Sequence, residues 1–291
     1  MTEQAGSYYR HSGRFPTGGL VVAIAGGGAV GAFLALIYAY FDALDPFIYF
    51  NMMASVILGA ASGWFTGLLL ARQRVRNNLI AAFAGGLVGL IALYVAWAAW
   101  PDAVLGDRSG MNMKFLHLLT SPAALLQSVG WINKNGAWRI GYSVQTGFVL
   151  WVAWVGEAVI VIGFSMYVAR IFVRDRVFCE ACQHWCEKEK NVLEAHGWGT
   201  EELSSRLEAK DFDYLATLGP RTRNDVEWIR LDLDRCKNCG ETTTLTAKRV
   251  DLTREKGREL PQPIIKDLLL SPSEVERLRS YNFDTSQSRS A

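Results

Sequence analysis

The chain has 291 residues, half of them hydrophobic, and its 30 basic and 28 acidic residues almost cancel. The first 176 residues contain 12 of the basic and 7 of the acidic residues, which leaves 18 basic and 21 acidic residues for the rest. Nucleic-acid-binding proteins usually carry a clustered positive surface, so this distribution argues against DNA or RNA as a partner.

Four apolar runs in the first part are long enough to cross a bilayer, because about 20 helical residues span a hydrocarbon core of about 30 Å. They lie at about 18–41, 47–70, 79–100 and 148–169. The first run is too long for the apolar core of a signal peptide, so we expect it to be retained. These runs predict a four-helix transmembrane domain at 18–170, with membrane lipid around it, after an N-terminal segment at 1–17.

The loop at about 101–141 is mixed in character. Its most apolar part, 113–127, is interrupted by Pro122, which favours an in-plane or re-entrant helix over a fifth span. Aromatic residues of the kind found at membrane interfaces flank the apolar runs. They are Trp100, Trp131, Trp138 and Tyr142.

Basic residues predict the orientation, since cytoplasmic loops are enriched in them. One side of the predicted bundle receives eight arginines, and the other side receives four basic residues. The eight are Arg10, Arg14, Arg72, Arg74, Arg76, Arg170, Arg174 and Arg176, and the four are Arg108, Lys114, Lys134 and Arg139. We therefore expect both termini in the cytoplasm and the long loop outside it. In general organisation the chain is similar to proteins of the bacterial inner (cytoplasmic) membrane, which is the location we expect.

Small residues recur at four-residue spacing in the first three runs, which places them on one helix face and allows close helix packing. They are Gly27, Gly31, Gly59, Gly63, Gly67, Gly85 and Gly89. The favoured interpretation is packing within one bundle. The alternative is association of two copies through the face of Gly59.

Glu157 lies inside the fourth run, where a lipid-facing carboxylate would cost at least a few kcal/mol. It must face protein or water, or carry a proton. A structural role predicts a hydrogen bond to Ser55, Ser62, Thr66 or a carbonyl exposed by a glycine. The alternative is a site that handles protons or cations during transport.

All five cysteines follow the last apolar run, and an odd number argues against a disulfide framework. They are Cys179, Cys182, Cys186, Cys236 and Cys239. The two C-x-x-C spacings instead indicate thiolates that hold a metal in a reducing compartment, in agreement with the predicted orientation.

The second C-x-x-C lies between two strand-like segments in about 226–250, and Gly240 supplies the backbone freedom that a tight turn needs. Together with 179–182, this part of the chain resembles a zinc ribbon, whose two knuckles clamp one zinc ion. The resemblance implies a structural zinc held by four cysteines. These are Cys179, Cys182, Cys236 and Cys239.

Two alternatives to this ligand set remain open. Cys186 or His184 can replace one of the four cysteines, or the thiols can be free or redox-active without a metal. A closed four-thiolate site has no position for a reacting water molecule. It therefore favours a recognition module over a reaction centre.

The soluble part is expected to form an α+β zinc-ribbon-like domain at 171–254, with an insertion at 187–224 that is helical around 200–210. A linker, a short helix and a polar tail follow at 255–291. Ser271, Pro272 and Glu274 form the pattern of a capping box, which predicts a helix over 272–279.

No catalytic constellation is recognisable, so we do not expect an enzyme. The sequence predicts a membrane all-α domain joined to a small cytoplasmic zinc-binding domain. Such a protein would serve in anchoring or assembly and would bind a protein partner. The alternatives are a small transporter or channel subunit that uses Glu157, and a membrane-tethered redox sensor that uses Cys186 with a cysteine of one of the C-x-x-C pairs.

Overall fold

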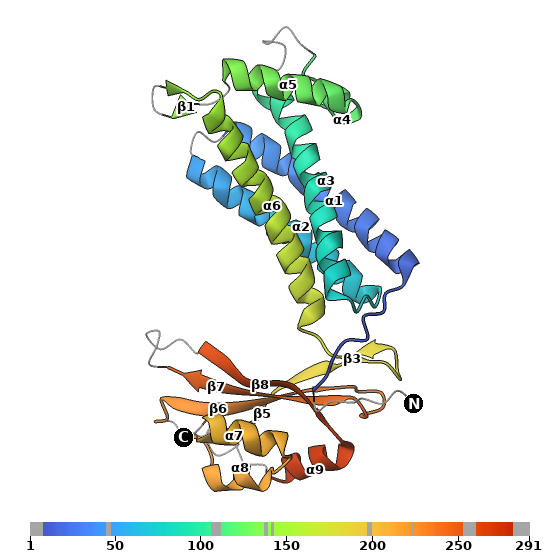
Figure 1. Ribbon diagram of the computed structural model, residues 1–291, viewed down its shortest axis with the longest axis vertical. Coiled ribbons are helices and arrows are strands. Elements are labelled where there is room, and N and C mark those ends of the chain that lie inside the picture. The colour runs from blue at the N-terminus through green and yellow to red at the C-terminus, as the bar shows by residue number, and fades with distance from the viewer. Residues whose placement is uncertain are drawn as a thin grey trace. The chain divides into compact units, whose positions relative to one another are not determined.

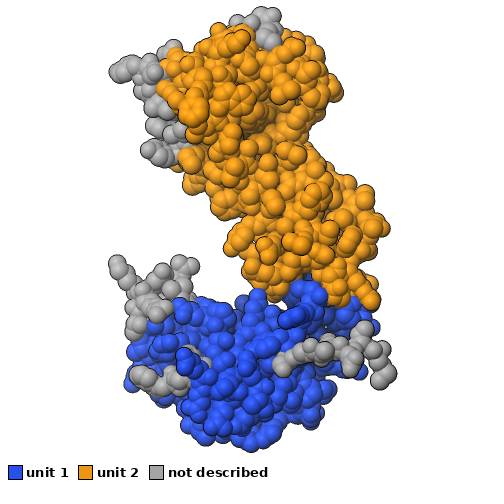
Figure 2. Space-filling view, in the orientation of Figure 1, with its two compact units in different colours: residues 1–11, 176–291 blue, residues 12–175 orange. Residues whose placement is uncertain are grey.

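The computed structural model describes residues 8–44, 48–105, 112–136, 139–140, 143–196, 200–222, 224–252 and 260–281 (Figure 1). They form two compact units (Figure 2). The bundle unit spans 12–175. The cysteine unit consists of the residues before 12 and those from 176 onward, so the two ends of the chain share one unit.

The bundle unit is built on four helices that are long and apolar enough to span a membrane. They are α1 (Thr17–Leu44), α2 (Ile48–Arg72), α3 (Asn78–Val104) and α6 (Phe148–Arg174). Asn77 begins α3 firmly, because its side-chain oxygen accepts hydrogen bonds of 3.0 Å from the N–H groups of both Leu79 and Ile80.

The loop after α3 contains two short helices, α4 (Phe115–Thr120) and α5 (Pro122–Asn135), which lie across the end of the bundle (Figure 1). At six and fourteen residues, both are too short to span a bilayer. Ser121 separates them and caps α5. A small hairpin of β1 (Arg139–Ile140) and β2 (Ser143–Val144) follows. Trp138 and Tyr142 lie outside the described residues.

The predicted glycines lie at helix contacts inside the bundle. A Cβ atom added at Gly59 or Gly63 would stand 2.5 Å from a carbonyl oxygen of α6, and the same holds at Gly85. Gly67 and Gly89 also face α6, and Gly27 and Gly31 face side chains of α2 and α3. The face of Gly59 is thus covered by a helix of the same chain.

The cysteine unit contains an antiparallel sheet in the order β5-β6-β7-β8, with three helices on one face (Figure 1). The strands are β5 (Glu187–His196), β6 (Glu227–Arg235), β7 (Thr243–Asp251) and β8 (Leu260–Leu270). The helices are α7 (Thr200–Glu208), α8 (Asp213–Leu218) and α9 (Pro272–Ser280). Alternate strand residues such as Leu231 and Leu245 pack with Leu203, Leu207 and Leu278 in the core between sheet and helices.

The other sheet face carries buried polar residues. Asp232 is 2% exposed, forms an ion pair of 2.6 Å with Lys248 and accepts a hydrogen bond from the backbone N–H of Asn191. Burial alone would raise the pKa of Asp232, but these partners hold it below its usual value. Burial raises the pKa of Asp234, which forms an ion pair of 3.5 Å with Lys188.

Two parts of this sheet differ from the sequence expectation. The insertion from 187 begins with strand β5, which pairs with β6, and the expected linker gives way from Leu260 onward to strand β8. The many polar residues of β5 mask the alternating pattern by which a strand is recognised in the sequence. Pro261 and Pro263 do the same for β8, although a strand at the edge of a sheet can contain prolines. The capping box does form and begins α9 as expected.

Candidate metal centre

The second C-x-x-C forms the loop between β6 and β7. The N–H of Cys236 donates to the carbonyl of Thr242, and the N–H of Gly240 donates to the carbonyl of Cys236, both at 2.9 Å. Gly240 has a φ of +70°, a left-handed conformation that glycine adopts without strain. The turn brings Cys239 back beside Cys236.

The first C-x-x-C forms a matching turn between β3 (Phe178–Cys179) and β4 (His184–Trp185), which pair with each other. Gln183 follows this C-x-x-C as Gly240 follows the other, and it too is left-handed, with a φ of +55°. Its side chain donates to the carbonyl of Glu180 at 2.6 Å and so braces the turn. The two loops therefore have the same local design.

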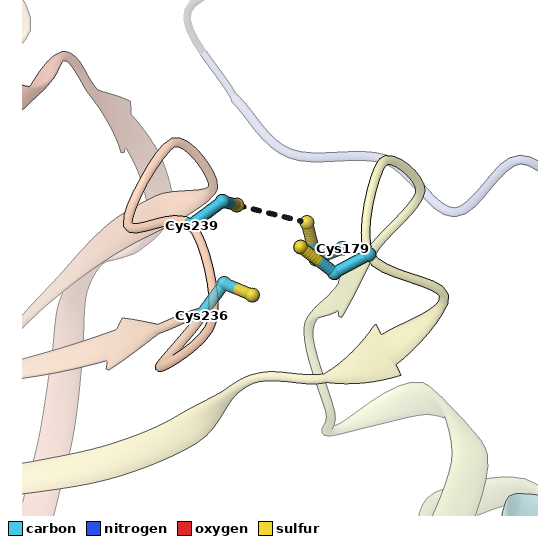
Figure 3. A group of neighbouring side chains, drawn as sticks. Cys179, Cys236 and Cys239 are labelled. Atoms are coloured by element: carbon cyan, nitrogen blue, oxygen red, sulfur yellow. Dashed lines mark hydrogen bonds between the residues drawn. The ribbon is translucent and has the colours of Figure 1, made fainter.

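The two loops bring four sulfur atoms together. The Sγ atoms of Cys179, Cys182, Cys236 and Cys239 all lie within 4.8 Å of one another. Figure 3 shows Cys236 and Cys239 on one loop opposite Cys179 on the other, with 3.6 Å between the sulfurs of Cys179 and Cys239. Four sulfurs around a tetrahedral ion with bonds of about 2.3 Å would be separated by about 3.8 Å. The group can therefore hold one metal ion.

Backbone N–H groups point at two of these sulfurs. The N–H of Cys182 donates to the sulfur of Cys179, and those of Asn238 and Cys239 donate to the sulfur of Cys236. Such bonds favour the thiolate, which is the form that binds metals. Burial acts to raise the pKa of Cys236, yet the donors outweigh it and lower this pKa to about 7.

Neighbouring thiols act in the opposite direction on another member of the group. Hydrogen bonding with the thiol of Cys239 raises the pKa of Cys182 to about 12. A metal ion that binds here must therefore displace protons, so its apparent affinity will rise with pH.

The two competing ligands lie outside the group of four. The Nδ1 atom of His184 bonds to the carbonyl of Cys182 at 2.6 Å, which holds the ring against its own turn. The thiol of Cys186 donates to the carbonyl of Thr242 at 3.8 Å, and burial raises its pKa to about 12. A buried thiol with a raised pKa is a poor nucleophile, which disfavours Cys186 as a redox-active residue.

Glu157 takes part in a hydrogen-bonded network inside the bundle. Its carboxylate accepts a hydrogen bond of 2.8 Å from the hydroxyl of Tyr38, and that hydroxyl also bonds to Ser55 at 3.0 Å. Ser55 is thus linked to Glu157 through the hydroxyl of Tyr38. Tyr38 was not among the partners expected from the sequence, because nothing near it in the chain marks a tyrosine in an apolar run as the partner of an acid.

The other expected partners of Glu157 are used differently. Thr66 donates to the carbonyl of Ser62 within α2. A carbonyl exposed by a glycine does accept a bond between helices, but the donor is Ser165, whose hydroxyl lies 2.6 Å from the carbonyl of Gly85.

No family model matches the chain, and no curated protein or solved structure matches it either. Function is therefore inferred from the four apolar helices and the four-cysteine centre.

Proposed function

We propose that the chain is an integral membrane protein whose cysteine unit holds one structural zinc ion and recruits a protein partner in the cytoplasm. Its role is then to anchor or assemble that partner at the membrane. The observation that carries this proposal is the four-cysteine centre, formed by two separate loops of a chain that also has four apolar helices.

Zinc suits this centre better than other common ions. Four sulfur ligands in a tetrahedral arrangement favour zinc or an iron–sulfur centre, and calcium and magnesium require oxygen ligands. The two C-x-x-C turns, one between β3 and β4 and one between β6 and β7, support the resemblance to a zinc ribbon. Four protein ligands leave no coordination position for water, so the ion stabilises the fold and does not act on a substrate.

Cytoplasmic placement follows from the arginines. Arg72 and Arg174 lie in the last turns of α2 and α6, and Arg74 and Arg76 lie in the connection to α3. In the inner membrane of a bacterium, these ends would face the cytoplasm, with both chain termini on that side. Thiols there remain reduced and available to a metal.

Recruitment can be tested by affinity purification of the full chain in mild detergent. We expect a partner at constant stoichiometry with the wild type and with Cys186→Ser, because Cys186 lies outside the metal group. Cys236→Ser removes one metal ligand and should lose that partner while the protein remains in the membrane fraction. A wild type that purifies alone, or a Cys236→Ser variant that retains the partner, would contradict recruitment by the metal-stabilised unit.

A second candidate function, transport, is favoured by one observation. The carboxylate of Glu157 lies at the junction of α1, α2 and α6, where Tyr38 and Ser55 supply further oxygen atoms. Ion flux into proteoliposomes should then differ between the wild type and Glu157→Gln. Equal flux, or no flux with either protein, would eliminate transport through this site and leave Glu157 as a structural group.

A further inference from the structure

Residues 8–11, which we call the N-terminal strap, belong to the cysteine unit although they precede the first apolar helix. Tyr8 forms an antiparallel bridge with Leu268 of β8, and the N–H of Tyr9 donates to the carbonyl of Asp267 at 2.8 Å. Asp267 has a φ of +58°. The strap thus pairs with the β8 edge of the sheet through a single isolated bridge.

The hydroxyl of Tyr9 bonds to the strand that carries the first metal ligand. It accepts a hydrogen bond of 3.0 Å from the N–H of Phe178 and lies 3.3 Å from the carbonyl of the same residue. Phe178 immediately precedes Cys179, and both are almost completely buried, at 1% and 0% exposure. One side chain of the strap therefore satisfies both backbone groups of the residue next to a ligand.

Aromatic rings extend this contact to the other strand of the hairpin. The centroid of the His11 ring lies 5.3 Å from that of Tyr9 and 6.3 Å from that of Trp185. The ring centroids of Trp185 and Phe178 are 5.0 Å apart. At the other end of the strap, the hydroxyl of Tyr8 donates to the carboxylate of Glu208 in α7. The strap thus forms hydrogen bonds with α7, with strand β8 and with the hairpin of β3 and β4.

The hairpin needs such support because β3 and β4 have two residues each. An isolated two-stranded hairpin is marginally stable even when its strands are longer. The hairpin of β3 and β4 can be stabilised in two ways. A metal ion would bind it through Cys179 and Cys182, and the strap contacts it through Phe178 and Trp185.

From this arrangement we propose that metal binding and docking of the N-terminal strap are coupled, so that each strengthens the other. The inference rests on the proposed metal site. Coupling of this kind is reciprocal at equilibrium: if the docked strap strengthens metal binding, the bound metal strengthens docking of the strap by the same factor. Five residues separate the strap from the start of α1 at Thr17, so the state of the metal would determine how the chain leading into the first apolar helix is held.

The first test measures the rate of zinc release from the full chain in detergent to a chromogenic chelator. Tyr9→Phe keeps the ring and removes the hydroxyl, and we expect release to be about fivefold faster, the effect of losing one hydrogen bond. Tyr9→Ala should release zinc faster still. Tyr167→Phe is the control, because this exposed tyrosine lies in α6.

The second test measures the reciprocal effect by limited cleavage with trypsin after Arg10, within the strap. We expect slow cleavage of the zinc-loaded wild type, fast cleavage after chelation, and fast cleavage of Tyr9→Ala in both states. The Tyr9→Phe arm of the first test separates coupling from general unfolding, since that variant should contain the full amount of zinc.

Two outcomes would overturn the coupling in distinguishable ways. Wild-type release rates for Tyr9→Phe and Tyr9→Ala at full zinc content would refute the role of the strap and leave the metal site intact. A wild type that contains no metal would refute the metal site itself, and the coupling with it.

Discussion

Asp232 shows how the cysteine unit accommodates a charge with almost no exposure to water. Its carboxylate has two specific partners, the ammonium group of Lys248 and the backbone N–H of Asn191. Replacing the carboxylate would remove the ion pair inside the fold and leave the ammonium group of Lys248, whose side chain is 23% exposed, without its counter-charge.

We therefore expect Asp232→Asn to lower the free energy of opening of the sheet by about 1–3 kcal/mol. Hydrogen exchange of peptides from β6 in the full chain measures this quantity. Asp211→Asn is a matched control, because its ion pair with Arg206 is partly exposed and should contribute less than about 1 kcal/mol. Equal effects of the two substitutions would contradict the assigned role of burial.

The pH dependence of this contribution has a defined sign. Because the pKa of Asp232 is lowered in the folded protein, its stabilisation is present above the pKa of the unfolded chain. It is lost as the pH falls through the folded value. When the pH is lowered, the protection of β6 against hydrogen exchange, corrected for the intrinsic pH dependence of exchange, should therefore decrease more in the wild type than in Asp232→Asn.

Individual residues differ in how far sequence could predict them. Each C-x-x-C pair is local and visible from its spacing, and the resemblance to a zinc ribbon implied the four sulfurs that the structure brings together, with Cys186 and His184 left open as substitutes. Tyr38 and Tyr9 could not be found in this way, because their partners lie 119 and 169 residues away in the chain. A hydroxyl group in an apolar or aromatic segment gives no local indication of so distant a contact.

At the level of elements, the four long helices follow directly from their apolar length, and α9 follows from its capping box. Strands β5 and β8 could not be predicted with the same rules. Five of the ten residues of β5 are charged, and β8 contains two prolines, so neither shows the pattern of a typical strand. Both exist because the apolar residues among them, such as Leu193 and Leu268, are buried in the core of the unit.

The contact between α2 and α6 leads to a prediction about the glycines. A Cβ atom at Gly63 would stand 2.5 Å from the carbonyl oxygen of Ser165, closer than packed atoms tolerate. Gly63→Ala should force the helices apart and lower stability by about 1–3 kcal/mol. Thermal denaturation of the detergent-solubilised chain measures this as a lower Tm.

Gly156→Ala is the matched control, because a Cβ atom added at this position of α6 would meet no neighbouring atom within 4 Å. We expect its Tm to remain close to that of the wild type. If Gly63→Ala were as stable as Gly156→Ala, close packing of α2 against α6 would not be what requires the glycine.

At the level of the whole molecule, the chain leaves the cysteine unit after residue 11 and returns to it at residue 176. Since an even number of long helices lies between these points, a membrane-spanning arrangement of all four places both connections on the same side. The proposed topology therefore agrees with a cysteine unit that is built from segments on both sides of the four helices.

Reporter fusions test this topology in a bacterial host. Green fluorescent protein at the C-terminus should fluoresce, and alkaline phosphatase at the same point should be inactive, because the C-terminus is proposed to be cytoplasmic. Fusions after Leu105, at the end of α3, should show the opposite pattern. Active phosphatase at the C-terminus would contradict the orientation derived from the arginines.

The most direct test of the central claim is the metal content of the full chain, purified in detergent without added metal and measured by inductively coupled plasma mass spectrometry. We predict one zinc ion per chain in the wild type and in Cys186→Ser, and almost none in Cys236→Ser. A wild type without zinc, or a Cys236→Ser variant that folds and retains one zinc ion, would contradict a structural centre formed by Cys179, Cys182, Cys236 and Cys239.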